Sequence, residues 1–382
     1  MHSAGSGQTQ GEPQGDLKPV QSRFRVGTEV RFEMLRMAVA LTIGFLVTAL
    51  IVVLTSDQPG ESLRCLFLGP LERARYIFNV VELMLPLMFT GVAVCICFSA
   101  KQFNLASEGT FFFGGMVAAV AAITLTLPKG IHAAVCIALA GLSGGVIGAI
   151  PGILKHKWRA SELVLSLMLN YVCYSTSMYV IRHHFRDVYA GAIVSHLFQK
   201  TAVMTKLQPP QRLTTWGVIL VLAVCAIAYL FLYKTRWGFT IRATGENVQF
   251  AGYAGLNVGF AVIGSQAIAG MVAGMGGAVE MLSMFTRFQW TTLTGFGWDG
   301  LIVAIFARNN PKYVPFSAAF LAYLRIGADI MLRRTGVQME IVKVIQAILI
   351  VLLVAESFLA KTHHRMVVRE ATSTATGSGE VA

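Results

Sequence analysis

The sequence predicts an all-α, polytopic membrane protein with about ten transmembrane helices, some of them short or broken. Hydrophobic residues make up 55% of the 382 residues and charged residues only 13%, whereas a soluble domain carries about 25% charged residues. Mean hydropathy is +0.63, and a soluble protein of this length could not cover its surface with so few charges. Apolar runs close to the roughly 20 residues that a helix needs to cross a bilayer recur along the chain.

These runs place the expected helices in order. They cover residues 37–54, 78–99, 110–127, 131–154, 163–181, 215–233, 258–280, 297–307, 314–331 and 341–360. The run at 297–307 is too short to cross a bilayer alone. Such half-helices characteristically end near the bilayer midplane.

Both ends of the chain are polar and are expected to lie outside the membrane. Residues 1–36, rich in Gly, Gln and Pro at their start, form an N-terminal segment that is expected to be largely disordered, and residues 361–382 form a disordered tail. The transmembrane domain is therefore expected at 37–360. No cleavable signal peptide is expected, because a polar segment precedes the first apolar run.

Lys and Arg near the span ends indicate the orientation. With both termini on the inner side, the inner segments hold 17 of these residues and the outer segments 12. We therefore expect both termini in the cytoplasm. The net charge of +12 lies in short clusters between apolar runs, which is typical of cytoplasmic loops and does not favour nucleic-acid binding. Five of the six cysteines lie in apolar runs and no C-x-x-C is present, so neither a disulfide network nor a zinc site is expected.

Glycines spaced by four residues recur in two expected spans. Small residues at this spacing let helix backbones approach closely in lipid. We expect these stripes to serve packing within the bundle, with a weak hint of internal duplication. The pairs are Gly141/Gly145, Gly144/Gly148, Gly148/Gly152 and Gly270/Gly274.

Polar side chains at membrane depth are costly, and they are therefore candidates for a transport pathway. Glu108 follows Asn104 by four positions, which puts both on one helix face if the segment is helical. The stretch 100–109 is either an inner turn or a break that lines a cavity. Glu108 has two open roles, in the pathway or as a structural clamp; a clamp predicts that Gln is tolerated while Leu lowers the amount of folded protein. For Asn170 and Gln266, interhelical hydrogen bonding is the simpler interpretation.

The start of the short span at 297–307 carries a further set of candidates. Phe296, Trp298 and Asp299 line the pathway in one interpretation; in the other, Asp299 is a charge favoured by the helix dipole. Aromatic residues cluster at 285–298, where they form either a slot for a flat base or an interfacial belt.

Other charges near span ends have simpler expectations. Arg325 and Asp329 are four residues apart, so an ion pair within one helix is expected. Glu82 and Glu280 are expected to reach the membrane interface.

The loop 234–257 between two spans is the most informative segment. Asn247 is expected to cap a short helix that runs through Ala251 and ends in Gly252 and Gly255. A short helix held between spans on the inner side is a docking device, although an ordinary amphipathic loop helix is the simpler alternative.

Four motifs in order resemble the permeases of ABC importers, in the simple-sugar and nucleoside branch related to branched-chain amino acid permeases. The resemblance covers about residues 75–355, and Ser161, Trp298 and Ala307 depart mildly from the family pattern. The motifs are F-N-L-A-S-E-G (103–109), S-E-L-V-L-S-L-M-L-N-Y (161–171), R-A-T-G-E-N-V-Q-F-A-G-Y-A-G-L-N (242–257) and G-F-G-W-D-G-L-I-V-A-I-F-A-R-N-N-P (295–311).

The resemblance implies a passive translocation subunit that imports a small polar solute, nucleosides first and simple sugars next. It also implies three protein partners: a cytoplasmic ATPase, a second permease that is more often a different chain, and an extracytoplasmic binding lipoprotein. The complex would lie in the cytoplasmic membrane of a prokaryote, in contact with lipid. The residues expected to couple to the ATPase are Arg242, Gly245, Glu246, Asn247, Gly252 and Gly255, and those expected along the pathway are Asn104, Glu108, Asn170, Gln266, Phe296, Trp298 and Asp299.

Motif absences agree with this expectation. The chain has no G-x-x-x-x-G-K-[ST], so ATP would be bound by the ATPase subunit and no cofactor by this chain. No catalytic motif is present, and no enzymatic activity is expected. The alternative is a secondary transporter driven by an ion gradient, which would need buried coupling carboxylates such as Glu108 and Asp299.

Overall fold

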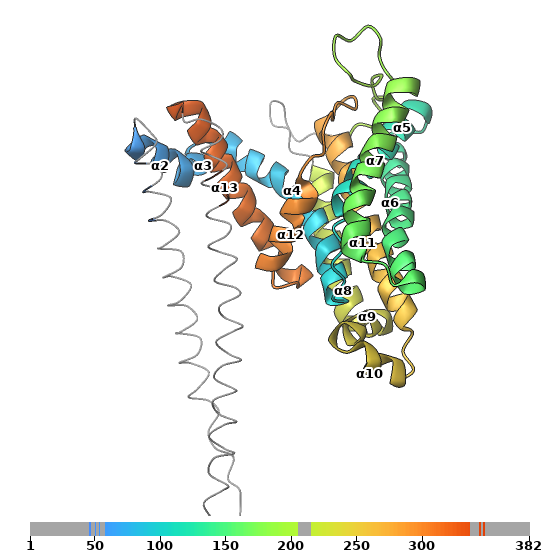
Figure 1. The fold of residues 1–382 in the computed structure, drawn as a ribbon. Coiled ribbons are helices and arrows are strands. Elements are labelled where there is room, and N and C mark those ends of the chain that lie inside the picture. The colour runs from blue at the N-terminus through green and yellow to red at the C-terminus, as the bar shows by residue number, and fades with distance from the viewer. Residues whose placement is uncertain are drawn as a thin grey trace, which may run out of the picture.

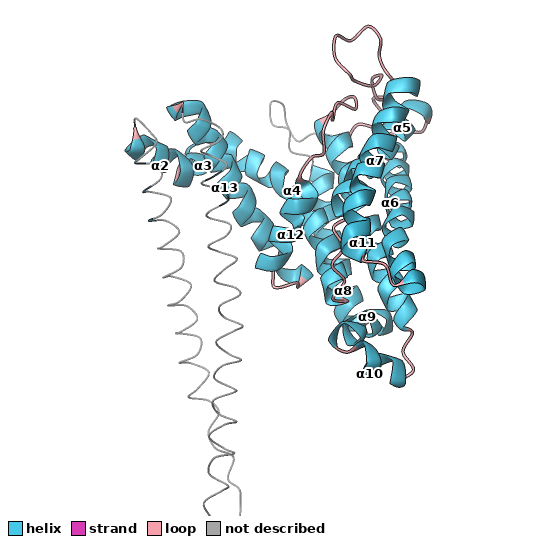
Figure 2. Cartoon of the chain, viewed as in Figure 1, coloured by secondary structure: helices cyan, strands magenta, loops and turns pink. Residues whose placement is uncertain are grey.

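A computed structural model describes residues 58–204 and 215–336, together with isolated helical positions at 46, 50, 53, 344 and 347. Within these residues the chain is helical apart from loops and one isolated bridge between Arg186 and Ser195 (Figure 2). Apart from the isolated positions, the spans expected at 37–54 and 341–360 and the end segments 1–36 and 361–382 lie outside the described residues.

The long helices agree with the apolar runs of the sequence. Seven of them, α4–α8, α11 and α13, are long and apolar enough to cross a membrane, and α12 is a shorter apolar helix. Every span expected inside the described ranges is confirmed to within about one helical turn, whereas α2, α3 and α9 were not predicted. The elements are α2 (Pro59–Phe67), α3 (Gly69–Glu72), α4 (Ala74–Ser99), α5 (Ser107–Thr124), α6 (Ile131–Trp158), α7 (Glu162–His184), α8 (Thr215–Lys234), α9 (Arg236–Glu246), α10 (Val248–Tyr253), α11 (Val258–Met284), α12 (Phe296–Phe306), η1 (Pro311–Tyr313) and α13 (Val314–Thr335).

Helix α11 is central to the bundle, where it packs against α4, α5 and α6 (Figure 1). Helix α4 joins this group to α12 and α13, and α13 packs in turn on α2 and α3. Helices α9 and α10 lie where α4 ends and α11 begins, which we call the α9–α10 end. At the opposite end, residues 195–204 pair with residues 282–288 and with the last turn of α5.

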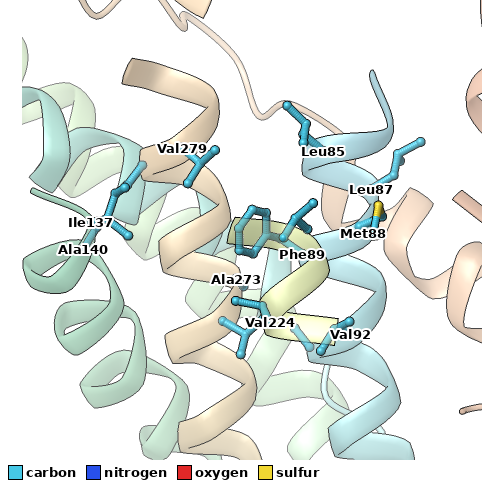
Figure 3. Packing of buried hydrophobic residues seen from close by; sticks show 14 of the residues in the cluster. Leu85, Leu87, Met88, Phe89, Val92, Ile137, Ala140, Val224, Ala273 and Val279 are labelled. Atoms are coloured by element: carbon cyan, nitrogen blue, oxygen red, sulfur yellow. The ribbon is translucent and has the colours of Figure 1, made fainter. Parts of the chain in front are cut away.

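The core is built from side chains of α4 that face α11. Phe89 of α4 is directed toward α11, with Ala273 and Val279 on the facing helix (Figure 3). This contact needs a small residue opposite the ring, because a Cβ added at Gly276 would lie 2.5 Å from the Cβ of Phe89. The pattern of large and small residues therefore fixes how α4 and α11 meet.

The glycine stripes serve packing, as the sequence predicts. A Cβ on Gly144 of α6 would lie 2.3 Å from the carbonyl oxygen of Gly270 on α11, and a Cβ on Gly270 would lie 2.3 Å from that of Gly144. The opposite face of α6 presents large apolar side chains to the surroundings, as a helix in lipid does. They include Leu139, Leu142, Val146, Ile150 and Ile153.

We predict that Gly144→Ala destabilises the protein, because the new methyl group meets backbone that cannot rotate away. Overpacking of this kind costs about 1–3 kcal/mol, which thermal unfolding of the detergent-solubilised protein would detect as a lower Tm. The matched control is Gly60→Ala in α2, where a Cβ meets nothing within 4 Å. Equal Tm values for Gly144→Ala and the unchanged protein would contradict the tight α6–α11 contact.

Candidate functional site

The chain between α4 and α5 is a non-helical segment whose second half, from Asn104, is buried and is held by side chains of α7. The backbone N–H of Leu105 donates to Ser166 Oγ at 3.1 Å, and its carbonyl accepts from Asn170 Nδ2 at 3.0 Å. Asn170 Oδ1 accepts in turn from the N–H of Gly109 at 2.8 Å. Asn170 thereby satisfies backbone groups on both sides of the break, as buried irregular backbone requires.

Asn104 holds the same segment against α11. Its Oδ1 accepts from the N–H of Ala106 at 2.7 Å, and its Nδ2 donates to Gln266 Oε1 at 3.0 Å. Asn104 precedes the first residue of α5, so the condition for a helix face shared with Glu108 is not met. The interhelical hydrogen bond is present for Asn170, which joins α7 to Gly109 of α5, whereas Gln266 of α11 bonds Asn104 in the non-helical segment.

Residues 100–109 divide into two parts. Lys101, Gln102 and Phe103 follow the end of α4 and line a cavity beside α9, so they lie at the α9–α10 end, and that this is the inner side stays a prediction. Asn170 and Gln266 lie eight positions into α7 and α11, which places them about 12 Å from the helix starts. The later part of the stretch is therefore a break inside the bundle.

Glu108, which is 1% exposed, clamps the start of α12. Its Oε1 accepts from the N–H of Gly295 at 2.7 Å and from Thr294 Oγ1 at 3.2 Å, and its Oε2 accepts from the N–H of Gly297 at 2.6 Å. Gly295 provides no side-chain cap of its own. A carboxylate from another helix thus satisfies the free N–H groups at the N-terminus of α12, where the dipole favours negative charge.

The clamp depends on a glycine. A Cβ on Gly297 would lie 2.5 Å from the backbone nitrogen of Glu108, so any side chain there would separate α5 from α12. A cysteine that reports on solvent access therefore cannot be placed at Gly297 without disturbing the fold. Asp299 is also unsuitable for such a cysteine, because its side chain is only 4% exposed.

Asp299 pairs with a cation from another helix. Its Oδ1 accepts from Arg325 of α13, while its Oδ2 is buried without a hydrogen-bond partner among the described residues. The expected Arg325–Asp329 pair is wrong: Asp329 instead pairs with Arg333 at 2.9 Å. The ion pair to Asp299 ties α12 to α13, so two carboxylates, Glu108 and Asp299, fix the first turn of the half-helix.

The aromatic residues near α12 pack against α5. Trp290 stacks on Phe111 at 5.7 Å between ring centroids, and Phe296 meets Phe111 edge-on at 5.4 Å. Phe288 is buried against Phe112. These rings fill the space between α5 and the segment 285–295 that connects α11 to α12. Trp298 is instead 46% exposed and is the accessible aromatic side chain of the first turn of α12.

The loop 234–257 is more helical than the sequence predicts. Asn247 Oδ1 accepts from the N–H of Phe250 at 3.0 Å, so the expected N-cap is confirmed, and α10 ends at Tyr253 just past Gly252. Gly255 has a φ of 73°, which favours glycine. Helix α9 was missed because its polar, Thr- and Gly-containing sequence carries no apolar run.

Helix α9 is seated against the ends of the spans. A Cβ on Gly245 would lie 2.3 Å from the carbonyl oxygen of Ser99, so glycine permits α9 to touch the end of α4. Arg242 Nε donates to the carbonyl of Leu232 at 2.9 Å, and its guanidinium lies 4.8 Å from the ring centroid of Tyr233. Glu246 forms an exposed ion pair with Lys101 at 3.1 Å.

Helices α9 and α10 expose large apolar side chains. They lie outside the long apolar helices, at one end of the bundle (Figure 1). Tyr253 is 93% exposed, and several exposed apolar side chains on one short helix pair, unlike a single one, mark an interaction site. We call this set the α9–α10 apolar face: Trp237, Phe239, Val248, Phe250 and Tyr253.

Two buried carboxylates were missed as site residues. Glu82 of α4 and Glu280 of α11 are buried and line one cavity, whereas the sequence places them near span ends and predicts that they reach the interface. Their separation by about 200 positions leaves no local pattern that could pair them. Among the described residues, no group of three or more His, Cys, Asp and Glu side chains could hold a metal ion.

The geometry defines a class of protein: a multi-pass membrane transport subunit, with a half-helix clamped inside its bundle and a helical pair exposed at one end. Residues 76–354 match the family described as branched-chain amino acid transport system / permease component. The chain therefore belongs to this family, and it is an ABC importer permease of the nucleoside and sugar branch.

Curated relatives cover most of the chain. The guanosine ABC transporter permease protein NupP of Bacillus subtilis is 29% identical over 323 residues, 84% of this chain and 92% of the relative. The nucleoside permease NupB of Lactococcus lactis is 28% identical, over 82% of this chain and 88% of the relative. The glucose permease TsgB13 of Haloferax volcanii is 25% identical, over 79% and 82%. No solved structure matches significantly.

We predict that Glu108→Leu strongly lowers the amount of folded protein in the membrane. Three donors lose their acceptor, and each unsatisfied buried donor costs about 1–3 kcal/mol. Glu108→Gln is also expected to destabilise, by less, because its amide NH₂ group would face one of two backbone N–H donors. With its oxygen at the Oε1 position, Gln would keep two of the three hydrogen bonds and lose the one to Gly297, so we expect partial rather than full tolerance of Gln.

The measurement is membrane abundance and detergent Tm for both Glu108 variants. The exposed Glu61→Gln is the control for loss of a carboxylate. Wild-type stability of Glu108→Gln would show that the clamp does not need two acceptors.

Proposed function

We propose that this chain is the membrane-embedded half of an ATP-driven nucleoside importer. A separate cytoplasmic ATPase energises it, and an extracytoplasmic binding lipoprotein delivers the substrate. A second permease, which we take to be a different chain, completes the pathway. The complex lies in the cytoplasmic membrane of a prokaryote with both termini of this chain inside. This chain binds no ATP and performs no covalent chemistry.

The observation that carries the proposal is the α9–α10 apolar face. Arg242, Gly245 and Glu246 hold α9 against α4 and α8, while Asn247 caps α10 and turns it outward. A rigidly seated helix pair that exposes Phe250 and Tyr253 to solvent fits the groove of another protein better than lipid headgroups. An ATPase that docks there would push on α9, which is anchored to the ends of α4 and α8.

Movement of α9 has a direct structural route to the half-helix. Helix α9 contacts α4, α8 and α11, and α4 packs along α12. A Cβ on Gly300 of α12 would lie 2.6 Å from Thr90 of α4, so α12 follows α4 closely. We infer that closure of two ATPases shifts α4 and α12 together as a rigid body, which alternates access to the pathway.

Nucleosides are the preferred substrate class. Two relatives that cover most of this chain are named for guanosine and for nucleosides, and a third is named for glucose. The shared element of these molecules is a sugar ring. We therefore place nucleosides first and simple sugars second.

The structure does not favour the ion-gradient alternative. Its candidate carboxylates already have fixed partners: Glu108 caps α12, and Asp299 pairs with Arg325. A coupling carboxylate must exchange its ion during each cycle, and these contacts would have to break each time.

Uptake of radiolabelled guanosine by cells expressing the complete transporter tests the proposed function. Uptake should require a catalytically intact ATPase subunit and should persist when an uncoupler collapses the proton gradient while ATP is maintained. Uptake that survives without the ATPase but stops with the uncoupler would support the ion-gradient alternative instead.

We predict that Tyr253→Asp abolishes docking of the ATPase while leaving the permease folded. The side chain contributes little to the fold, and a charge in an apolar contact costs several kcal/mol, so copurification of the ATPase should fall by about tenfold or more. Tyr189→Asp, at a fully exposed tyrosine in the loop that follows α7, is the matched control. Normal copurification with Tyr253→Asp would place the ATPase elsewhere.

We also predict that Trp298 lies beside the aqueous pathway. Trp298→Cys should react with a membrane-impermeant thiol reagent in one state of the ATP cycle, after removal of the six native cysteines, all of which are free and buried. Val146→Cys, on the exposed apolar face of α6, should stay unreactive in lipid. Equal reactivity of both positions in every state would contradict a gated pathway at Trp298.

A further inference from the structure

A cavity of about 600 Å³ opens between α4, α11 and α13, away from the residues proposed above for coupling. It is lined by the first part of α4, the last part of α11 and the last part of α13, so it lies toward the end of the bundle opposite α9 and α10. Its volume lies within the roughly 300–1,000 Å³ of small-molecule sites. From the distribution of Lys and Arg, this end of the bundle is expected to face the outside of the cell.

Glu280 is the informative residue of the cavity. It is 6% exposed and lines the cavity, and its Oε2 has no hydrogen-bond partner among the described residues. Glu82 lines the same cavity from α4 and interacts electrostatically with Glu280. Keeping two carboxylates together out of water is costly, which indicates a task that apolar residues could not perform.

The chemistry of the lining restricts the ligand. Two carboxyl groups that interact out of water are not both ionised, so the pair offers oxygens that accept hydrogen bonds and one O–H that can donate. A hydroxyl group, which both donates and accepts, matches either partner. Tyr76, Phe78 and Asn79 complete the wall beside Glu82, so the cavity offers aromatic faces together with a polar amide.

Three arginines line the cavity, Arg75, Arg333 and Arg334, and two of them are already engaged. Arg333 pairs with Asp329 at 2.9 Å, and Arg334 pairs with Glu72 at 2.6 Å. Arg333 and Arg334 are therefore poor partners for an incoming anion. A neutral ligand with adjacent hydroxyl groups matches this arrangement.

We propose that Glu280 and Glu82 accept hydrogen bonds from the vicinal hydroxyl groups of a sugar ring, and that this cavity is a transit site for the imported solute. This inference rests on the proposed import function. The ring can be the ribose of a nucleoside or a free sugar, because both present the same pair of donors. Tyr76 and Phe78 then face the remainder of the solute.

Uptake by the complete transporter tests the site with guanosine, 2′,3′-dideoxyguanosine and glucose. Glu280→Gln keeps the size of the side chain but replaces one carboxyl oxygen by an amide NH₂ group. It should lower uptake of the hydroxylated solute about tenfold, the effect of losing one hydrogen bond, with little change for the dideoxy analogue. Comparing each variant with the unchanged permease cancels the selectivity of the binding protein. Glu61→Gln in α2 is the matched control and should change neither rate.

Two different failures are distinguishable. If the unchanged transporter imports neither guanosine nor glucose with ATP, the proposed function fails. If it imports one of them but Glu280→Gln lowers uptake of the hydroxylated solute and of the dideoxy analogue equally, or lowers neither, this inference alone is overturned. A decrease confined to glucose supports the site with a free sugar as the substrate.

A second measurement keeps the inference testable if Glu280→Gln folds poorly. Cysteine is placed at Asn79, which is partly exposed to the cavity, in a permease without native cysteines. Millimolar guanosine or glucose should slow its reaction with an impermeant thiol reagent, and 2′,3′-dideoxyguanosine should not. Labelling that no solute slows, or that guanosine and its dideoxy analogue slow equally, overturns the transit site.

Discussion

The arrangement of the bundle depends on one carboxylate that caps a helix belonging to another part of the chain. Glu108, at the start of α5, takes the N–H groups of Gly295 and Gly297 that α12 leaves free. Without it, the half-helix would begin inside the membrane with unsatisfied donors. The same contact brings α5 and α12 close enough that Gly297 has no room for a side chain. One residue thus allows a short helix to begin within the bundle.

The break before α5 follows from the same constraint. Glu108 can reach α12 because the chain stops being helical after Ser99 and approaches the interior as a non-helical segment. That segment would itself carry unsatisfied backbone groups, and Asn170, Ser166 and Asn104 supply their partners. Gln266 of α11 holds the side chain of Asn104 in turn. The polar residues that stand out in the apolar sequence are therefore largely one connected network. Their first task is to make irregular backbone tolerable at membrane depth.

The sequence predicts what is local and misses what depends on distant partners. Apolar runs locate the long helices, and the cap at Asn247 and the glycine stripes are legible because their signals lie within a few residues. The partner of Arg325 is not, since Asp299 lies 26 positions away on another helix and competes successfully with Asp329, one turn along. Glu82 and Glu280 look like ordinary charges near span ends, and only the packing of α4 on α11 brings them into one cavity. Helix α9 has no apolar run that would predict it, and it is held in place by contacts with the ends of α4 and α8.

Helices α4 and α11 connect the two ends of the molecule. Each extends from the seat of α9 at one end to the wall of the carboxylate-lined cavity at the other, and Phe89 packs against Gly276 between them. A close-packed interface of this kind transmits displacement, because it cannot deform continuously. A push on α9, which contacts both helices, must therefore displace α4 and α11 as whole helices rather than bend them locally. Glu82 and Glu280 lie on these two helices, so relative movement of α4 and α11 would change their separation and the fit of a bound sugar. In the proposed transport cycle, docking of the ATPase at one end and release of the solute at the other are then two consequences of a single helix displacement.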